Sequence, residues 1–456
     1  MKKTLVVMLA LFLAIPAISY AGSATSRWDL TIGGNIKFDM GWSDQSGSES
    51  GNDMWSGGIP DRNPQSGNTQ TFDKYGAQLW GAGETGLNFF VKGPDAWGAK
   101  THALIVGDFT GFWGANPDIG PPANYNEFDL LIAEIGFDWE NTSLAMGANG
   151  AFFGQPATWT DSVGWNTLNF GGKGAAPVAP QVTVVERFSK EWSAGFGVIS
   201  PYNTVNQLMS PNTAASSAGP PFFNGPTQNI FRSPIPAFEG KVAYTSDSCG
   251  KIGPWQLLVE MDGFYGQIRE LYGPDQTAKD NTEYIADFKL IVPIIPEHNG
   301  NKAGALLGDG AVFMSQGGGT VGNWDANAAG GWLTSYWPDR ADPGDFVSPT
   351  LWGIYLHGQY YFTDSVRFNA FYYYASSNPS QALITEFGHA CGGQSPTEGA
   401  VTRAQQYVAN IVYDVNPAVR FTLEWDYTVA HYAPAQAGWK NMGSNNDWRL
   451  AAYYFF

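Results

Sequence analysis

A long segment near the start of the chain alternates strictly between apolar and polar residues. From Trp28 to Trp42 every second side chain is bulky and apolar, with Gly34 as the one gap. The residues between them are mostly polar, among them Lys37 and Asp39. Successive side chains of a strand point to opposite faces, so the segment predicts a two-sided β-strand. At about fifteen residues it exceeds the usual 5 to 6 of a globular strand and suits a tilted strand that crosses a membrane.

The same alternation recurs along the rest of the chain. Between Val419 and Val429 bulky apolar residues alternate with charged or polar ones, and a similar pattern occupies Trp255 to Asp262. One apolar and one polar face is the arrangement of a transmembrane barrel with a wet interior. About sixteen such segments are predicted, an even number as in bacterial barrels: 28–42, 78–92, 98–110, 126–139, 142–152, 179–189, 192–199, 236–245, 254–265, 282–292, 303–314, 350–362, 365–376, 403–413, 417–430 and 446–456.

The connections between these segments alternate between short and long. The short ones, such as Glu140-Asn141 and Thr363-Asp364, are turns, whereas the long ones are mostly rich in Gly, Pro, Asn and Ser. The long ones lie near 43–77, 111–125, 153–178, 200–235, 266–281, 315–349, 377–402 and 431–445. This rhythm matches short periplasmic turns and longer extracellular loops. The sequence therefore predicts an all-β fold, a transmembrane antiparallel β-barrel of about sixteen strands.

Composition excludes several classes of function. The chain has 14% charged residues, against about 25% in average soluble domains, and its net charge of -17 offers no electrostatic footprint for nucleic acid. Its five histidines are scattered, and no metal-binding or haem-binding motif occurs. We expect no cofactor, no metal and no catalytic residues, because no nucleophile and base stand in a recognisable motif.

The N-terminus predicts export. Lys2 and Lys3 form a basic start, Leu5 to Ile18 form an apolar run, and Ser19-Tyr20-Ala21 resembles a cleavage site. Residues 1–21 are therefore expected to be a signal peptide and residues 22–456 a single barrel domain. A membrane anchor is the competing interpretation, disfavoured because the run is short and broken at Pro16.

The two cysteines form no disulfide framework in an exported chain of this length. The order of turns and loops puts Cys249 in a periplasmic turn and Cys391 in an extracellular loop. They are expected on opposite sides of the membrane, where they cannot pair.

The last segment alternates up to the final residue, with Trp448, Tyr454 and Phe456 on one face. In a closed barrel the last strand pairs with the first, which leaves no edge unpaired in lipid. This terminus resembles the assembly signal of outer-membrane proteins, so Tyr454 and Phe456 are candidate contacts for the barrel-assembly machinery.

The whole mature chain resembles a sixteen-stranded trimeric porin of Gram-negative bacteria. Local matches lie at Val106 to Phe109, Leu144 to Gly147 and Asn410 to Tyr427. The resemblance implies a homotrimer in the outer-membrane bilayer and a water-filled channel for passive diffusion of small polar solutes and ions.

The resemblance also implies that the third long loop, near 153–178, folds into the lumen and narrows it. Its candidate residues are Trp159, Asp161, Trp165 and Lys173. Asp161 is the loop's only acid and Lys173 its only base, so a sharply charge-split constriction is not expected. The aromatic residues indicate either a narrow opening with apolar patches or packing of the loop against the wall.

Strand phase predicts which charges line the lumen, since charge on the lipid face costs about 2 to 4 kcal/mol at midplane. The candidates are Lys37, Asp39, Glu84, Asp108, Lys241, Glu260, Asp262, Arg367, Arg420, Glu424, Asp426 and Arg449. The same phase adds Glu239, Glu283, Asp287, Lys100, Arg187 and Lys289. Acids somewhat outnumber bases, so a mild cation preference is expected; wall salt bridges that neutralise one another are the alternative. A substrate-selective channel and a sheath for a redox partner are the competing functions.

Overall fold

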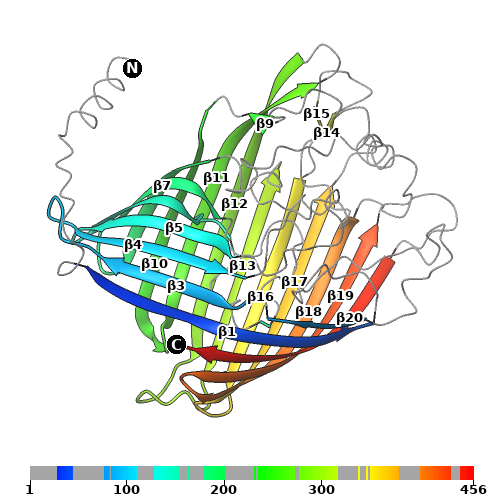
Figure 1. Cartoon of the computed structure of the whole chain (residues 1–456). Helices are drawn as coiled ribbons and strands as arrows, with labels where there is room; N and C mark the ends of the chain where they lie inside the picture. Colours follow the sequence, from blue (N-terminus) through cyan, green and yellow to red (C-terminus); the bar gives the residue numbers. More distant parts are fainter. Residues whose placement is uncertain are drawn as a thin grey trace, which may run out of the picture.

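The computed structural model describes 28–44, 77–82, 84–109, 128–154, 162–163, 178–200, 231–232, 235–272, 277–316, 337–338, 346–347, 350–378, 401–432 and 442–456. These residues form an antiparallel β-barrel (Figure 1). The signal peptide predicted at 1–21 lies outside the described residues.

Sixteen wall strands close the barrel, as predicted, when β2 and β3 are counted as one and the two-residue β9 is left out. The wall strands are β1 (Asp29–Ser43), β2 (Ala77–Gly81) with β3 (Gly86–Lys92), β4 (Lys100–Asp108), β5 (Asp129–Asp138), β6 (Thr142–Gly150), β7 (Val178–Arg187), β8 (Trp192–Ile199), β10 (Ala237–Ile252), β11 (Trp255–Tyr272), β12 (Thr277–Ile295), β13 (Leu306–Gln316), β16 (Thr350–Tyr361), β17 (Val366–Asn378), β18 (Val401–Asn416), β19 (Val419–Tyr432) and β20 (Met442–Phe455). The short β9 (Phe231–Arg232) pairs with β11, and β14 (Trp337–Pro338) pairs with β15 (Phe346–Val347).

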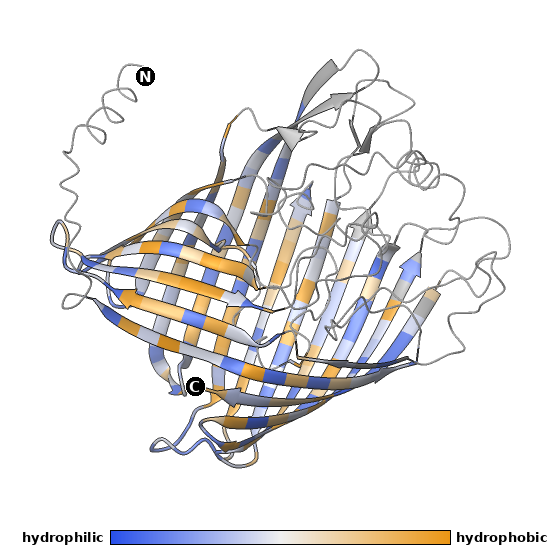
Figure 2. Cartoon of the chain, in the orientation of Figure 1, coloured by the Kyte–Doolittle hydropathy of each residue, from blue (hydrophilic) through white to orange (hydrophobic). Residues whose placement is uncertain are grey.

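The two faces of the wall differ as the alternation predicts. On β16 the side chains of Leu351, Tyr355 and His357 are buried, whereas those of Trp352 and Leu356 between them are exposed. Apolar and polar residues alternate along the strands (Figure 2). Large apolar side chains exposed on the outer face, with charge turned inward, are the pattern of a barrel surrounded by lipid. Among the described residues, no helix has the length and apolar character of a membrane span.

Exposed aromatic residues gather near the ends of the strands that are joined by short turns. Trp97 and Phe188 flank two of these turns, and Tyr360 contacts Phe362 edge to face at a third. Aromatic belts of this kind mark the membrane–water interfaces of transmembrane barrels. We refer to the aromatic residues at the short-turn end as the periplasmic belt.

The first and last wall strands meet in a seam, as the C-terminal pattern predicts. β1 and β20 pair from Asn35–Phe455 to Ser43–Asp447. Gly34 and Phe456 then exchange two backbone hydrogen bonds, each of 3.1 Å. A Cβ at Gly34 would overlap the carbonyl of Gly86 on β3 and come within 3.2 Å of the Phe456 ring. This crowding explains why glycine interrupts the apolar face of β1.

One predicted loop is wrong. The long loop near 266–281 is mostly strand, because β11 continues to Tyr272 and β12 begins at Thr277. Here the two strands pair from Gly266–Glu283 to Tyr272–Thr277. Past Tyr265 the sequence loses its alternation of apolar and polar residues, so hydropathy gave no sign that the ladder continues.

Cys249 lies in the last part of β10, where the register with β11 shifts between Ser246 and Lys251. It is a free, exposed thiol next to the short turn that begins at Gly253. The prediction that Cys249 lies in a turn is wrong, because β10 continues to Ile252, but the residue does lie at the short-turn end of the barrel. Cys391 lies outside the described residues.

Candidate functional site

The predicted lumen-lining residues lie on the inward phase of the wall. Nine of the twelve are buried: Lys37, Asp39, Glu84, Asp108, Asp262, Arg367, Glu424, Asp426 and Arg449. The side chains of Lys241, Glu260 and Arg420 are 24%, 12% and 25% exposed. Lys100, by contrast, lies at a strand end with its side chain 78% exposed and pairs with Asp95 in the turn. The phase of a strand identifies its inward face, but it does not say how far along the strand the lumen extends.

The first residues of the predicted constriction loop dock on the inner face of β10 and β12. The backbone N–H of Phe152 donates to Glu239 Oε2 at 2.9 Å, and its carbonyl accepts from Lys289 Nζ at 2.7 Å. The N–H of Gly154 donates to Asp287 Oδ2 at 3.1 Å. We call these contacts the proximal clamp.

Apolar contacts reinforce the proximal clamp. The ring of Phe153 packs edge to face on Phe264 of β11, with centroids 5.4 Å apart, inside a buried cluster that includes Ile285. Lys241 Nζ lies 4.7 Å from the centroid of the Phe152 ring, within cation–π range. The chain therefore contacts β10, β11 and β12 directly after β6 ends, although β7 and β8 lie between β6 and these strands in the wall.

Further along the loop, Ser162 and Val163 are buried against β1 and β19. The N–H of Val163 donates to Glu424 Oε2 at 2.8 Å, and its carbonyl accepts from Lys37 Nζ at 2.6 Å. The hydroxyl of Ser162 hydrogen-bonds Glu424 Oε1 at 3.3 Å. We call these contacts the distal clamp.

The two clamps lie in parts of the wall that are far apart around the barrel (Figure 1). Phe152 and Gly154 thus contact β10 and β12, whereas Ser162 and Val163 contact β19 and β1. The candidates Trp159, Asp161, Trp165 and Lys173 lie outside the described residues. Most hydrogen bonds that hold the described loop residues are made by backbone groups of Phe152, Gly154 and Val163, for which side-chain type gives no signal.

The distal clamp belongs to a buried, acid-rich cluster. Lys37 Nζ also pairs with Asp39 at 3.1 Å and with Glu84. Arg449 lies 3.5 Å from Glu424, and its other two carboxylate partners are Asp426 at 3.6 Å and Asp447 at 3.3 Å. Five carboxyl groups thus surround two basic groups. Lys37, Arg449 and Glu424 come together because β20 pairs with both β1 and β19.

The proximal clamp is acid-rich too. Lys289 Nζ lies 2.8 Å from Asp262 and 2.9 Å from Glu260, and Lys241 lies 3.8 Å from Glu260. With the clamp residues Glu239 and Asp287, four carboxyl groups share two lysines. Charged groups withdrawn from water are costly unless they are paired and hydrogen-bonded, and both clusters meet this need partly through the loop backbone.

A third charged group lies toward the periplasmic end and is basic. Arg367 and Arg420 both pair with Asp414. The guanidinium of Arg367 lies 6.0 Å from the ring of Tyr361, and that of Arg420 lies 5.3 Å from Phe455. At this position two guanidinium groups share one carboxylate, so the group is basic, unlike the two acid-rich clusters at the clamps.

A buried polar network between these regions was not anticipated from the sequence. His357 Nδ1 lies 2.6 Å from Asp309 Oδ2, and its Nε2 lies 3.1 Å from Asn369 Oδ1. The imidazole stacks on Phe371 with centroids 4.2 Å apart. Asn369 continues the network to Gln359 and Asn410. The only sequence signal for this network was that its residues occupy inward-facing positions of β13, β16, β17 and β18.

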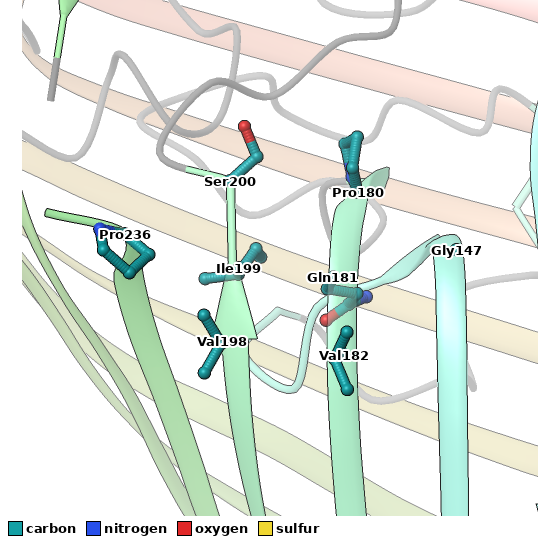
Figure 3. Close-up of a pocket in the computed structure, with 8 residues that line it drawn as sticks. All are labelled: Gly147, Pro180, Gln181, Val182, Val198, Ile199, Ser200 and Pro236. Atoms are coloured by element: carbon teal, nitrogen blue, oxygen red, sulfur yellow. The ribbon is translucent and has the colours of Figure 1, made fainter. Parts of the chain in front are cut away.

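Two concave features lie on the outer face of the wall. One, of about 380 Å³, is lined by Gly147, Pro180, Val182, Val198 and Pro236 among others (Figure 3). The other, of about 780 Å³, crosses β12, β13, β16, β17 and β18. Because Val182 and Val198 are exposed on the lipid-facing phase, the first is a surface groove and not part of a passage through the barrel.

No protein-family model and no curated protein matches the chain. Among solved structures, the outer-membrane channel DcaP of Acinetobacter baumannii superposes with a TM-score of 0.63 at 12% identity, over 95% of this chain and 99% of that one. An anion-selective porin from Comamonas acidovorans aligns over 94% of this chain and 100% of its own, with 10% identity and a TM-score of 0.49. The chain thus has the predicted fold of the sixteen-stranded outer-membrane porins, and together with its lipid-facing surface this places it in the outer membrane of a Gram-negative bacterium.

Proposed function

We propose that the protein is a porin: a water-filled channel for passive diffusion of small polar solutes and ions, narrowed by the loop that the two clamps hold. The observation that carries the proposal is the docking of Val163 on Lys37 and Glu424, on the opposite side of the barrel from the contacts of Phe152 and Gly154. A loop fixed there leaves room for small solutes, whereas a protein sheathed by the barrel would have to displace it. This favours a channel over a sheath for a redox partner.

The proposed channel prefers cations. At the two clamps nine carboxyl groups accompany four basic side chains: Asp39, Glu84, Glu239, Glu260, Asp262, Asp287, Glu424, Asp426 and Asp447, with Lys37, Lys241, Lys289 and Arg449. Charged rings in a narrow passage set ion preference. The excess of acid lies where the loop narrows the lumen, so it acts on the ions that pass.

Single-channel recording in a planar bilayer tests the proposal. The folded protein should conduct, and its reversal potential in a KCl gradient should have the sign for potassium over chloride. Glu239→Gln removes one clamp charge and should move the reversal potential toward zero. Asp247→Asn is the matched control, because Asp247 is exposed in the periplasmic part of β10 and pairs with Lys190. Absence of conductance from correctly folded protein would refute the channel, and saturation by one solute would move it to the substrate-selective class.

We also propose that the barrel is a homotrimer that is assembled through its C-terminal strand, with Tyr454 and Phe456 as the signal. The support is the resemblance of the terminus to outer-membrane assembly signals and the closing position of β20. Heat-modifiable migration on a denaturing gel tests both the barrel and the trimer, and a detergent-independent monomer would contradict them.

A further inference from the structure

The inner wall of the barrel is not equally accessible to water on all sides. Along the middle of β16 to β19 the inward side chains are buried, among them Asn369 and Thr428. On β3 and β4 the side chains that share the inward phase of Asp108 are more open: Asn88 is exposed and Leu104 is half-buried. A solute in the proposed channel can therefore touch the side chains of this part of the wall.

In this accessible part of the wall, His102 of β4 is held between two carboxylates of β5. Its Nε2 lies 3.5 Å from Glu134 Oε1, and its Nδ1 lies 3.1 Å from Asp138 Oδ2. The His102 side chain is 20% exposed and that of Asp138 is 45% exposed. Between the two acids β5 carries Gly136, where a Cβ would lie 2.1 Å from the His102 ring. The glycine thus leaves the space that the imidazole occupies.

The two carboxylates also have partners on the next strand. The side-chain amide of Asn149 donates a hydrogen bond to Glu134 Oε2, and the hydroxyl of Ser143 donates one to Asp138 Oδ1 at 2.8 Å. Both donors belong to β6. Because these bonds do not involve His102, they hold the carboxylates in place whether or not the imidazole carries a positive charge.

The proton count of the imidazole decides the net charge of this group. Each ring nitrogen faces a carboxylate oxygen, and only the doubly protonated imidazolium has a donor on both nitrogens. Histidine is the side chain that ordinarily changes its charge between pH 5 and pH 8. The other neighbours of His102 are on β3: the ring of Phe90, with centroids 5.4 Å apart, and Lys92, its exposed register partner.

We infer that His102 is a specificity-determining residue of the channel, which makes the cation preference increase as the pH rises. The inference rests on the proposed function, since it concerns ions that pass along the inner wall. When the imidazolium gives its proton to water, Glu134 and Asp138 keep their places but lose the positive charge between them. The pair then attracts cations and repels anions more strongly, because charged groups that line a passage set its ion preference.

Reversal potentials of the full-length barrel in a planar bilayer, recorded in a KCl gradient at pH 5 and at pH 8, test the inference. The permeability ratio of potassium to chloride should rise about twofold over this range, the effect of one unit charge about 10 Å from the passing ion. In His102→Asn the rise should be smaller by this factor. The other titratable groups are present in both proteins, so the difference between them isolates the imidazole.

His298→Asn is the matched control, because His298 is exposed in the turn between β12 and β13, where its ring bonds the side chain of Asn299. This variant should keep the pH dependence of the parent protein. Asp138→Asn removes one of the two carboxylates and should lower the permeability ratio at pH 8. Heat-modifiable migration confirms that the variants fold, and His102→Gln replaces His102→Asn if the latter does not.

Two results would overturn the inference and leave the channel standing: the same pH dependence in His102→Asn as in the parent protein, or loss of the pH dependence in His298→Asn. An unchanged permeability ratio in Asp138→Asn at pH 8 would also contradict it, since the ions would then not sense this part of the wall. Absence of conductance from the folded parent protein would refute the proposed channel itself, and the role of His102 with it.

Discussion

Phe152 and Val163 are held by opposite parts of the barrel wall through the same pair of contacts. For each of the two residues, a carboxylate accepts a hydrogen bond from the backbone N–H, and a lysine donates one to the backbone carbonyl. The carboxylates come from β10 and β19, and the lysines from β12 and β1. Both polar groups of one residue are thus satisfied by a buried ion-pair network, which fixes the loop at two points across the lumen.

Removal of the Glu424 carboxylate should release the loop at its distal clamp. A hydrogen bond to a charged group contributes about 1.5–3 kcal/mol, so Glu424→Ala should raise the released fraction of loop roughly tenfold or more. We expect larger and noisier single-channel conductance. Glu424→Gln retains an acceptor for the Val163 N–H and should keep the parent conductance with weaker cation preference. Identical recordings from both variants would show that the loop is not held there.

Gly34 should tolerate no side chain. A Cβ there overlaps a backbone carbonyl of β3, which cannot move aside, so Gly34→Val should cost about 3 kcal/mol or more, the upper end for overpacking. The measurement is the folded fraction after refolding into vesicles, seen as heat-modifiable migration. Gly358→Ala, at an equally outward glycine with open space around it, should fold normally. Normal folding of Gly34→Val would contradict the crowded seam.

Charge on the outer face should be costly in proportion to depth. Leu423 is exposed at mid-wall and pairs with Leu450, whereas Tyr413 is exposed near the periplasmic belt. Leu423→Arg should destabilise the barrel by about 2–4 kcal/mol and Tyr413→Arg by about 0–1 kcal/mol. Equilibrium unfolding by guanidinium in lipid vesicles measures the difference. Equal losses at the two positions would place the membrane elsewhere on the wall.

The two thiols should remain unpaired. Cys249 is exposed at the periplasmic end of β10, and the order of turns and loops predicts Cys391 on the extracellular side. The intact mass of protein alkylated without reductant should therefore carry two labels. An unlabelled chain with a mass two hydrogen atoms lower than that of the reduced protein would reveal an intrachain disulfide and refute the predicted order of loops around Cys391.

The wall was predictable because apolar and polar side chains alternate along its strands with a period of two residues. The alternation that begins at Trp28 identified the sixteen strands. It also put Glu424 and Arg449 on the inner face, since each of these two residues has an apolar neighbour on either side. Closure of the barrel then predicted that the first and last strands pair. This pairing puts Lys37 beside Glu424 and Arg449.

The loop was less predictable, because its contacts do not depend on side-chain pattern. Any residue except proline at 152 or 163 offers the same N–H and carbonyl groups, so these backbone bonds are not marked by residue type. The extended hairpin of β11 and β12 was missed for a related reason: backbone pairing continues past Tyr265 after the apolar alternation has stopped.

Because both clamps use peptide groups, the backbone hydrogen bonds that hold the loop do not depend on which side chains it carries. The four backbone hydrogen bonds of Phe152 and Val163 involve no side chain between Gly154 and Ser162. Variants that differ at Trp159, Asp161 and Trp165 would then keep these four bonds and differ in what the passage admits. The barrel is in this respect a starting point for engineering pores of chosen selectivity, with the anchoring network kept constant.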